Sequence, residues 1–131
     1  MPLELSSAVH DALLAEALAA GDEECCGLLL GSGNRIDAHR PAANVHPSPA
    51  RHFEISPAVL IAMLRGEREG GPRIAGYYHS HPGGPCAPSA TDSALAPRDG
   101  RIWAIVTMTE VALWRDCDDG FKPLPYRLVK P

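Results

Sequence analysis

Two histidines two positions apart are the residues of this sequence best suited to metal chemistry. His79 and His81 directly follow the apolar and aromatic run 74–78, which predicts a β-strand. Side chains at positions i and i+2 of a strand point to the same face, so both imidazoles can reach one point while Ser80 faces away. The pair therefore predicts a metal site at the carboxyl end of this strand.

A serine and an aspartate follow after a loop of proline and glycine. Ser89 and Asp92 stand where a short helix is expected to begin, and their spacing is close to that of a capping box. The cap does not prevent Asp92 from also reaching a metal. Two imidazoles and one carboxylate suit zinc and leave a fourth tetrahedral position for water. We therefore expect His79, His81 and Asp92 to bind Zn²⁺ in a catalytic site.

An acidic pair, Glu23 and Glu24, precedes the continuous apolar run 25–30, which predicts a buried strand. Taken alone, these carboxylates are typical of a solvated connection between a helix and a strand. A hydrolytic zinc site, however, also needs a carboxylate that is not a ligand and that takes the proton of the water. Gly27 within the run predicts close approach by another backbone.

The composition excludes several classes of protein. The chain has 131 residues, of which 45% are hydrophobic and 21% charged, and we expect residues 1–131 to form a single domain. A net charge of −4 without a basic cluster argues against nucleic acid and anionic membranes as partners. No apolar run approaches the roughly 20 residues of a membrane span, and the first residues do not resemble a signal peptide. The expected location is cytoplasmic, with all four cysteines reduced.

The remaining pattern predicts the elements that must position these residues. Helices are expected from Ser6 or Ser7 to about Ala20 and from 57 to 68, with Glu16 on the solvated side of the first. The strands are expected at 3–5, 26–30, 35–41, 73–79, 102–108, 111–115 and 122–128. This order predicts a mixed α/β (α+β) fold, with a curved, largely antiparallel sheet of about seven strands flanked by two main helices.

Residues 79–92 match the metalloprotease motif of the JAMM (JAB/MPN+) family, H-(S/T)-H-P followed after six residues by S-x-x-D. The family's other catalytic residue is a glutamate in the pattern E-x-x-G before an apolar strand, and Glu24 with Gly27 fits it. The sequence resembles this family, and its stand-alone bacterial members in particular, in both motifs and in the order of its elements. The resemblance implies the cytidine-deaminase-like JAB/MPN fold. Deaminase chemistry itself is disfavoured, because the P-C-x-x-C motif is absent.

The resemblance also implies a role for each motif residue. His79, His81 and Asp92 would bind zinc, with water in the fourth position. Glu24 would act as the general base on this water and return the proton to the leaving amine. Ser89 would help to hold the oxyanion of the tetrahedral intermediate, because serine without a neighbouring base is a poor nucleophile.

Family members cut peptide or isopeptide bonds after the Gly-Gly tail of ubiquitin-like proteins. The resemblance therefore implies a zinc-dependent metallopeptidase acting on a ubiquitin-like, β-grasp sulfur-carrier protein. Two alternatives stay open, namely removal of ubiquitin-like modifiers from lysine and a catalytically silent MPN-type scaffold. Scaffolds usually lack one or more ligands, whereas this sequence has all of them together with Glu24 and Ser89.

Three further side chains near the motif have less defined roles. His46 and His52 are potential ligands in a proline-punctuated loop, where nothing in the sequence fixes their geometry. Cys86 lies between the two halves of the motif, where family members commonly have a small residue that does not bind the metal. It is either a small loop residue or a thiolate that reaches the metal or is oxidised.

Overall fold

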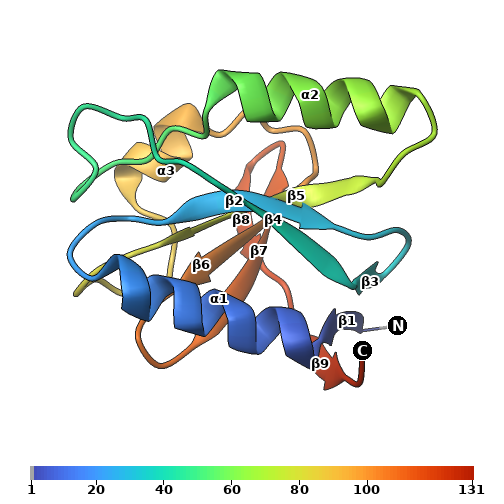
Figure 1. Cartoon of the computed structure of the whole chain (residues 1–131). Helices are drawn as coiled ribbons and strands as arrows, with labels where there is room; N and C mark the ends of the chain where they lie inside the picture. Colours follow the sequence, from blue (N-terminus) through green and yellow to red (C-terminus); the bar gives the residue numbers. More distant parts are fainter. Residues whose placement is uncertain (1) are drawn as a thin grey trace.

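The computed structural model describes residues 2–131, and within this range the chain forms nine strands and three helices (Figure 1). The elements in chain order are β1 (Leu3–Ser6), α1 (Ser7–Ala20), β2 (Cys26–Leu30), β3 (Arg35–Ile36), β4 (Ala38–Ala42), α2 (Pro57–Arg68), β5 (Ile74–Ser80), α3 (Ala90–Leu95), β6 (Ile102–Val106), β7 (Val111–Cys117), β8 (Gly120–Pro123) and β9 (Tyr126–Val129). None of the described helices is long and apolar enough to cross a membrane.

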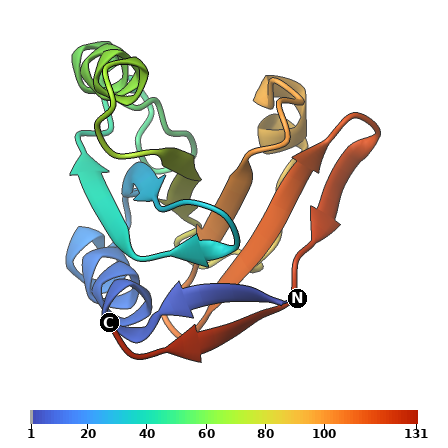
Figure 2. The ribbon, with the colours of Figure 1, turned by 90° about the vertical axis from the view of Figure 1, so that its right-hand side faces the viewer.

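Six of the strands form one sheet in the order β4-β2-β5-β6-β7-β8. All its pairings are antiparallel except that between β5 and β6, which is parallel. A second, smaller sheet has the order β3-β1-β9, and both of its pairings are parallel. Figure 2 shows this smaller sheet along the lower edge of the molecule. The first and last strands of the chain are thus neighbours.

Helices cover both faces of the large sheet, with α1 on one side and α2 on the other (Figure 1). Val9, Leu13 and Ala17 of α1 are buried in a core with residues of β2, β5, β6 and β7. On the opposite face, Val59, Leu60, Met63 and Leu64 of α2 pack against a second cluster, whose buried members are Cys26, Leu28, Ile55 and Ile74. The strands between the two helices therefore contribute side chains to two separate cores.

The helix boundaries follow local chemistry. Gly21 ends α1 with a φ of 62°, a conformation that costs glycine little. Pro57 opens α2, where its fixed φ and missing N–H are tolerated. The expectation that Glu16 is solvated is wrong, because its carboxylate is half-buried and accepts a hydrogen bond of 2.8 Å from the Tyr78 hydroxyl. Helical periodicity alone did not reveal this partner on β5.

The mixed α/β class with flanking helices is confirmed, while two of the seven expected strands are each divided in two, which gives the nine observed. The expected strand 122–128 is divided into β8 and β9, since Pro125 between them has no N–H to donate to a ladder. The expected hairpin partner of β2 begins at Ala38, whereas Arg35 and Ile36 pair with β1 instead. Gly27 is closely approached, as predicted, and a Cβ there would lie 2.3 Å from the Arg40 carbonyl oxygen.

Candidate metal centre

The two histidines of the H-x-H pattern stand at the end of β5, with His79 within the strand and His81 directly after it. The Nε2 atoms of His79 and His81 lie 3.0 Å apart. His79 is fully buried, and the side chain of His81 is 10% exposed. The residue between them, Ser80, contacts Cys25 of the neighbouring chain segment instead. The alternation of a strand thus brings two imidazole nitrogens together at the surface of the sheet.

Helix α3 places a carboxylate beside the two imidazoles. The Asp92 carboxylate lies 3.1 Å from Nε2 of His79 and 3.1 Å from Nε2 of His81. Its orientation is fixed by a capping box, in which the Asp92 N–H donates to Ser89 Oγ and the Ser89 N–H donates to Asp92 Oδ2. The predicted cap is therefore present, and one carboxylate both caps the helix and faces the histidine pair.

The carbonyl group of Pro85 indicates which nitrogen of His81 is protonated. His81 Nδ1 lies 2.9 Å from this oxygen. A carbonyl oxygen only accepts hydrogen bonds, so Nδ1 carries the proton and neutral His81 presents the lone pair of Nε2 to the centre. His79 Nδ1 has no hydrogen-bond partner within residues 2–131. The His79 ring is instead held by Phe53, which stacks on it with ring centroids 4.1 Å apart.

Burial and hydrogen bonds act in opposite directions on these three groups. Burial lowers the pKa of His79, which favours the neutral imidazole. At His81 burial also opposes the charged form, but the Asp92 carboxylate and the Pro85 carbonyl outweigh it and raise the pKa. Burial would raise the pKa of Asp92, but its interactions with the His79 and His81 side chains hold this pKa well below its ordinary value. Asp92 is therefore ionised in the neutral pH range.

The second acidic candidate, Glu24, is brought to the same point from the other motif. Strand β2 pairs with β5 in antiparallel register, with Cys26 opposite His79. Ligand atoms of Glu24, His79 and His81 all lie within 4.8 Å of one another. Glu24 is only 8% exposed, whereas Glu23 is exposed. Burial raises the pKa of Glu24 to about 7, against the opposing effect of His81.

Two residues that the sequence did not single out hold the backbone of Glu24. The Glu24 N–H donates to the Pro49 carbonyl over 2.8 Å. The Asn44 side chain donates to the Glu24 carbonyl and to the His52 carbonyl, at 2.9 Å each. Asparagine in a proline-rich segment is an ordinary loop residue, so the sequence contains no local signal for this role.

The donor set fits a transition-metal ion such as zinc. Ligands at 2.0–2.1 Å in a tetrahedral arrangement are separated by about 3.3 Å. The Nε2 and carboxylate oxygen atoms of His79, His81 and Asp92 are 3.0–3.2 Å apart, which is close to this separation. Two imidazoles with a carboxylate are a ligand combination used by zinc and by other divalent ions. The side chains are therefore gathered as a metal would require.

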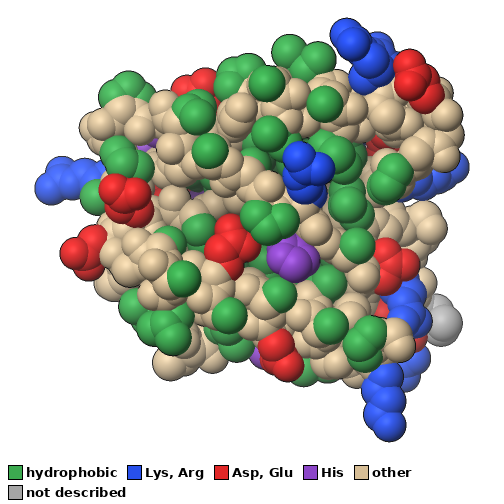
Figure 3. Space-filling view, viewed as in Figure 1, with side chains coloured by type: hydrophobic (Ala, Val, Ile, Leu, Met, Phe, Trp, Pro, Cys, Tyr) green, Lys and Arg blue, Asp and Glu red, His purple; other side chains and the backbone are tan. Residues whose placement is uncertain are grey.

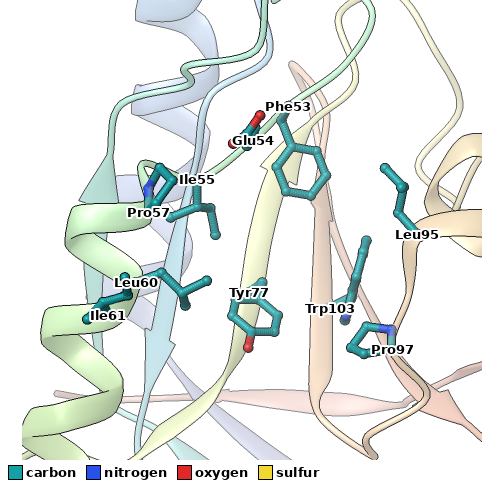
Figure 4. A pocket seen from close by; sticks show the side chains of 10 residues that line it. All are labelled: Phe53, Glu54, Ile55, Pro57, Leu60, Ile61, Tyr77, Leu95, Pro97 and Trp103. Carbon is teal, nitrogen blue, oxygen red and sulfur yellow. The ribbon is translucent and has the colours of Figure 1, made fainter.

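A largely apolar groove adjoins the centre. It has a volume of about 390 Å³ and lies between α2 and α3, with β5 beneath it (Figure 4). Phe53 and Trp103 belong both to its wall and to the surroundings of His79, because each ring contacts that imidazole. Figure 4 shows Leu60 on the α2 side and Leu95 on the α3 side, facing each other across Tyr77. The groove and the metal centre thus share the Phe53 and Trp103 side chains as a common wall.

The less defined candidates lie outside the centre. The rings of His46 and His52 contact each other with centroids 4.7 Å apart, and neither belongs to the group of converging metal donors found among the described residues. The Cys86 thiol donates to the Ile105 carbonyl over 3.1 Å, and burial raises its pKa. This geometry favours the interpretation of Cys86 as a packed loop residue with a protonated thiol.

Comparison with known proteins identifies the family. Residues 6–117 match a family model described as prokaryotic homologs of the JAB domain. A desampylase of Haloferax volcanii is 34% identical over 79% of this chain and 78% of its own length. A probable TtuB-protein conjugate cleaving protease of Thermus thermophilus is 37% identical over 50% of this chain and 45% of its own.

Solved structures share the fold. A Desulfitobacterium hafniense protein superposes with a TM-score of 0.84 at 28% identity, over 98% of this chain and 94% of that one. A JAB1/MPN domain protein of Archaeoglobus fulgidus gives a TM-score of 0.65 at 19% identity, over 98% and 97% of the two chains. The fold predicted from the motif resemblance is therefore confirmed.

Proposed function

The chain belongs to the family of prokaryotic homologs of the JAB domain and is a hydrolase of the JAMM type, and we propose that it is a zinc-dependent peptidase acting on ubiquitin-like proteins. The observation that carries the proposal is the convergence of Glu24 with the histidine pair from a distant part of the sequence. A buried carboxylate beside two imidazoles is costly to a fold and is typical of a functional site.

In the proposed site, His79, His81 and Asp92 hold the metal. Bound zinc supplies a Lewis acid that lowers the pKa of water to about 7 and polarises the scissile carbonyl. The Pro85 carbonyl keeps the Nδ1 proton of His81 in place, so that Nε2 stays free as a ligand atom. Phe53 covers His79 and restricts the access of bulk water to it.

Glu24 takes the proton of the attacking water and then delivers it to the leaving amine. A general base works best when its pKa is near the working pH, and burial moves the pKa of Glu24 upward in that direction. Ser89 Oγ accepts one hydrogen bond from the Asp92 N–H, which leaves its own O–H as a donor. We assign this donor to the developing oxyanion, where one such bond contributes about 100-fold or more to the rate.

The proposed substrate is the extended Gly-Gly tail of a ubiquitin-like or sulfur-carrier protein. The names of the Haloferax and Thermus relatives support an enzyme that cleaves protein conjugates. A tail without side chains is narrow enough to reach a buried histidine pair, and the apolar groove beside Phe53 and Trp103 offers space for residues upstream of it. On the face shown in Figure 3, hydrophobic and uncharged side chains surround a histidine, a positive side chain and a negative side chain near the middle, and most other charged side chains stand at the rim.

Cleavage assays on two kinds of substrate test the proposal. The purified protein is loaded with zinc and incubated with a sulfur-carrier protein extended beyond Gly-Gly, and separately with a ubiquitin-like protein joined to a lysine. Mass spectrometry then identifies the broken bond. We expect cleavage directly after Gly-Gly, its loss on chelation, and only a small residual rate in Glu24→Gln with zinc content retained.

The two substrates distinguish a processing peptidase from a deconjugating enzyme. A zinc-loaded protein that cleaves neither one would contradict the proposed activity and favour the scaffold. A Glu24→Gln variant as active as the wild type would show that another group is the base.

A further inference from the structure

The ladder between β2 and β5 changes its hydrogen bonding next to the metal centre. Its register pairs Cys26 with His79, so the next residues along, Cys25 and Ser80, are opposite each other. The Ser80 N–H donates to the Cys25 carbonyl over 3.0 Å, as in a regular ladder. The Cys25 N–H, however, donates over 2.9 Å to the Ser80 hydroxyl oxygen rather than to the Ser80 carbonyl.

A side chain thus replaces one backbone acceptor at the point where β2 begins. The N–H concerned belongs to the peptide group that joins Glu24 to Cys25. The carbonyl of the same peptide group accepts the hydrogen bond from Asn44. Both polar atoms of this peptide are therefore held by side chains, one from β5 and one from the loop that follows β4. Their directions fix the plane of the peptide and hence the direction in which the Glu24 side chain leaves the backbone.

Ser80 is well suited to this task because of its place in the motif. It lies between His79 and His81, it is only 2% exposed, and it faces away from the two imidazoles. One residue of β5 therefore links the strand that carries the histidines to the peptide that carries Glu24. An alanine at this position would leave the Cys25 N–H without its acceptor in a part-buried place.

We propose that Ser80 is a positioning residue, whose hydroxyl orients the Glu24–Cys25 peptide and so holds the Glu24 carboxylate at the His79–His81 pair. The proposal rests on the function proposed above. Misplacement of a reacting group by about 1 Å can cost about 100-fold in rate. The loss of one hydroxyl therefore affects the reaction although Ser80 touches neither metal nor substrate.

The test compares Ser80→Ala with Ser80→Thr, which keeps the hydroxyl, and with Ser6→Ala. Ser6 is a matched control, because it is 1% exposed and its hydroxyl has no partner within the described residues. We expect Ser80→Ala to lower kcat about 10- to 100-fold with KM changed less than about threefold and zinc retained. Ser80→Thr should recover most of the rate, and Ser6→Ala should behave as the wild type.

A double-mutant cycle separates positioning from a general loss of structure. If Ser80 acts through Glu24, then Ser80→Ala lowers the residual rate of Glu24→Gln by less than about threefold, because the group that it positions is gone. Equal factors in the two backgrounds would overturn the proposal. A wild-type rate in Ser80→Ala, or a rate in Ser80→Thr as low as in Ser80→Ala, would overturn it as well.

Amide hydrogen exchange provides a readout that does not depend on cleavage. We expect the Cys25 amide to exchange at least about tenfold faster in Ser80→Ala, while the Leu28 amide in the regular ladder keeps its rate. Unchanged exchange at Cys25 would overturn the inferred contact. Failure of the proposed function is recognised separately, because the wild type itself would then release no product, whereas failure of this inference leaves the wild type active.

Discussion

The two faces of strand β5 differ in how completely they are covered. Tyr78 and Ser80 face α1, and Tyr78 is fully buried in a core with residues of that helix. His79 and His81 face the opposite side, where Phe53 and Asp92 contact them. Adjacent residues of the chain thus enter a closed core on one side and the metal centre beside the groove on the other.

The helices on these faces show the same difference. Helix α1 buries Val9, Leu13 and Ala17, whereas none of the described residues of α2 is fully buried. The space left beside α2 is the groove of about 390 Å³. We infer that the α1 face stabilises the sheet and that the α2 face, being less tightly packed, is free to bind substrate. The following predictions test this division of roles.

The largest effect is expected at the metal centre, from Asp92→Asn. Asparagine keeps an oxygen that accepts the Ser89 N–H but loses the negative charge between the two histidines. We expect bound zinc to fall below about a tenth of an equivalent and cleavage to disappear. Metal analysis and the cleavage assay measure this. Asp116→Asn is the control, because it removes a fully buried charge paired with Arg98 and should lower stability without loss of zinc.

A core truncation on the α1 face should be the next largest effect. Leu13→Ala removes a fully buried side chain and should lower the free energy of unfolding by about 2–5 kcal/mol. Leu60→Ala on the α2 face removes the same atoms from a half-buried position and should cost about 1 kcal/mol or less. Urea titrations of the two variants measure the difference, and equal losses would contradict the division between the faces.

Ionisation of the buried Glu24 and the half-buried Glu16 should reduce stability on both faces, by a smaller amount. Burial raises the pKa of Glu24 to about 7 and also raises the pKa of Glu16. A carboxyl group whose pKa is raised by folding binds its proton more tightly in the folded state, so stability falls as the pH rises through that range.

In metal-free protein, Glu24→Gln should therefore be more stable than the wild type by about 1–3 kcal/mol above pH 7, a gain that disappears below about pH 4.5. Glu16→Gln should also raise the free energy of unfolding above pH 7, but by less. The glutamine oxygen can still accept the hydrogen bond from the Tyr78 hydroxyl. Urea titrations at pH 4 and pH 8 measure both. A gain that is equal at the two pH values would indicate altered packing instead of ionisation.

The smallest effect is expected in substrate binding, again from Leu60→Ala. Leu60 lines the groove and is not part of the metal centre, so its truncation should raise KM about 3- to 10-fold and leave kcat unchanged. Leu13→Ala, measured at a temperature where it is folded, should leave both constants unchanged. A fall of kcat in Leu60→Ala would indicate that the groove takes part in the chemical step.

The sequence by itself predicted those features of this protein that depend on local geometry. Strand periodicity placed His79 and His81 on one face, and the S-x-x-D spacing gave the capping box through which Asp92 is oriented. The motif resemblance added Glu24, and with it the requirement that β2 and β5 be neighbours, which the observed register fulfils. These features need only a few consecutive residues, whose backbone periodicity fixes where the side chains point.

Only the tertiary structure decided the contacts between residues far apart in the chain. The stacking of Phe53 on His79, the bonds from Asn44 and Ser80 to the Glu24–Cys25 peptide, and the parallel pairing of β1 with β9 all join such segments. The partner of Glu16 is of the same kind, since helical spacing shows only which residues share a face of α1. Phenylalanine, asparagine and serine are ordinary residues of loops and strands, so they become significant only when packing brings each to its partner.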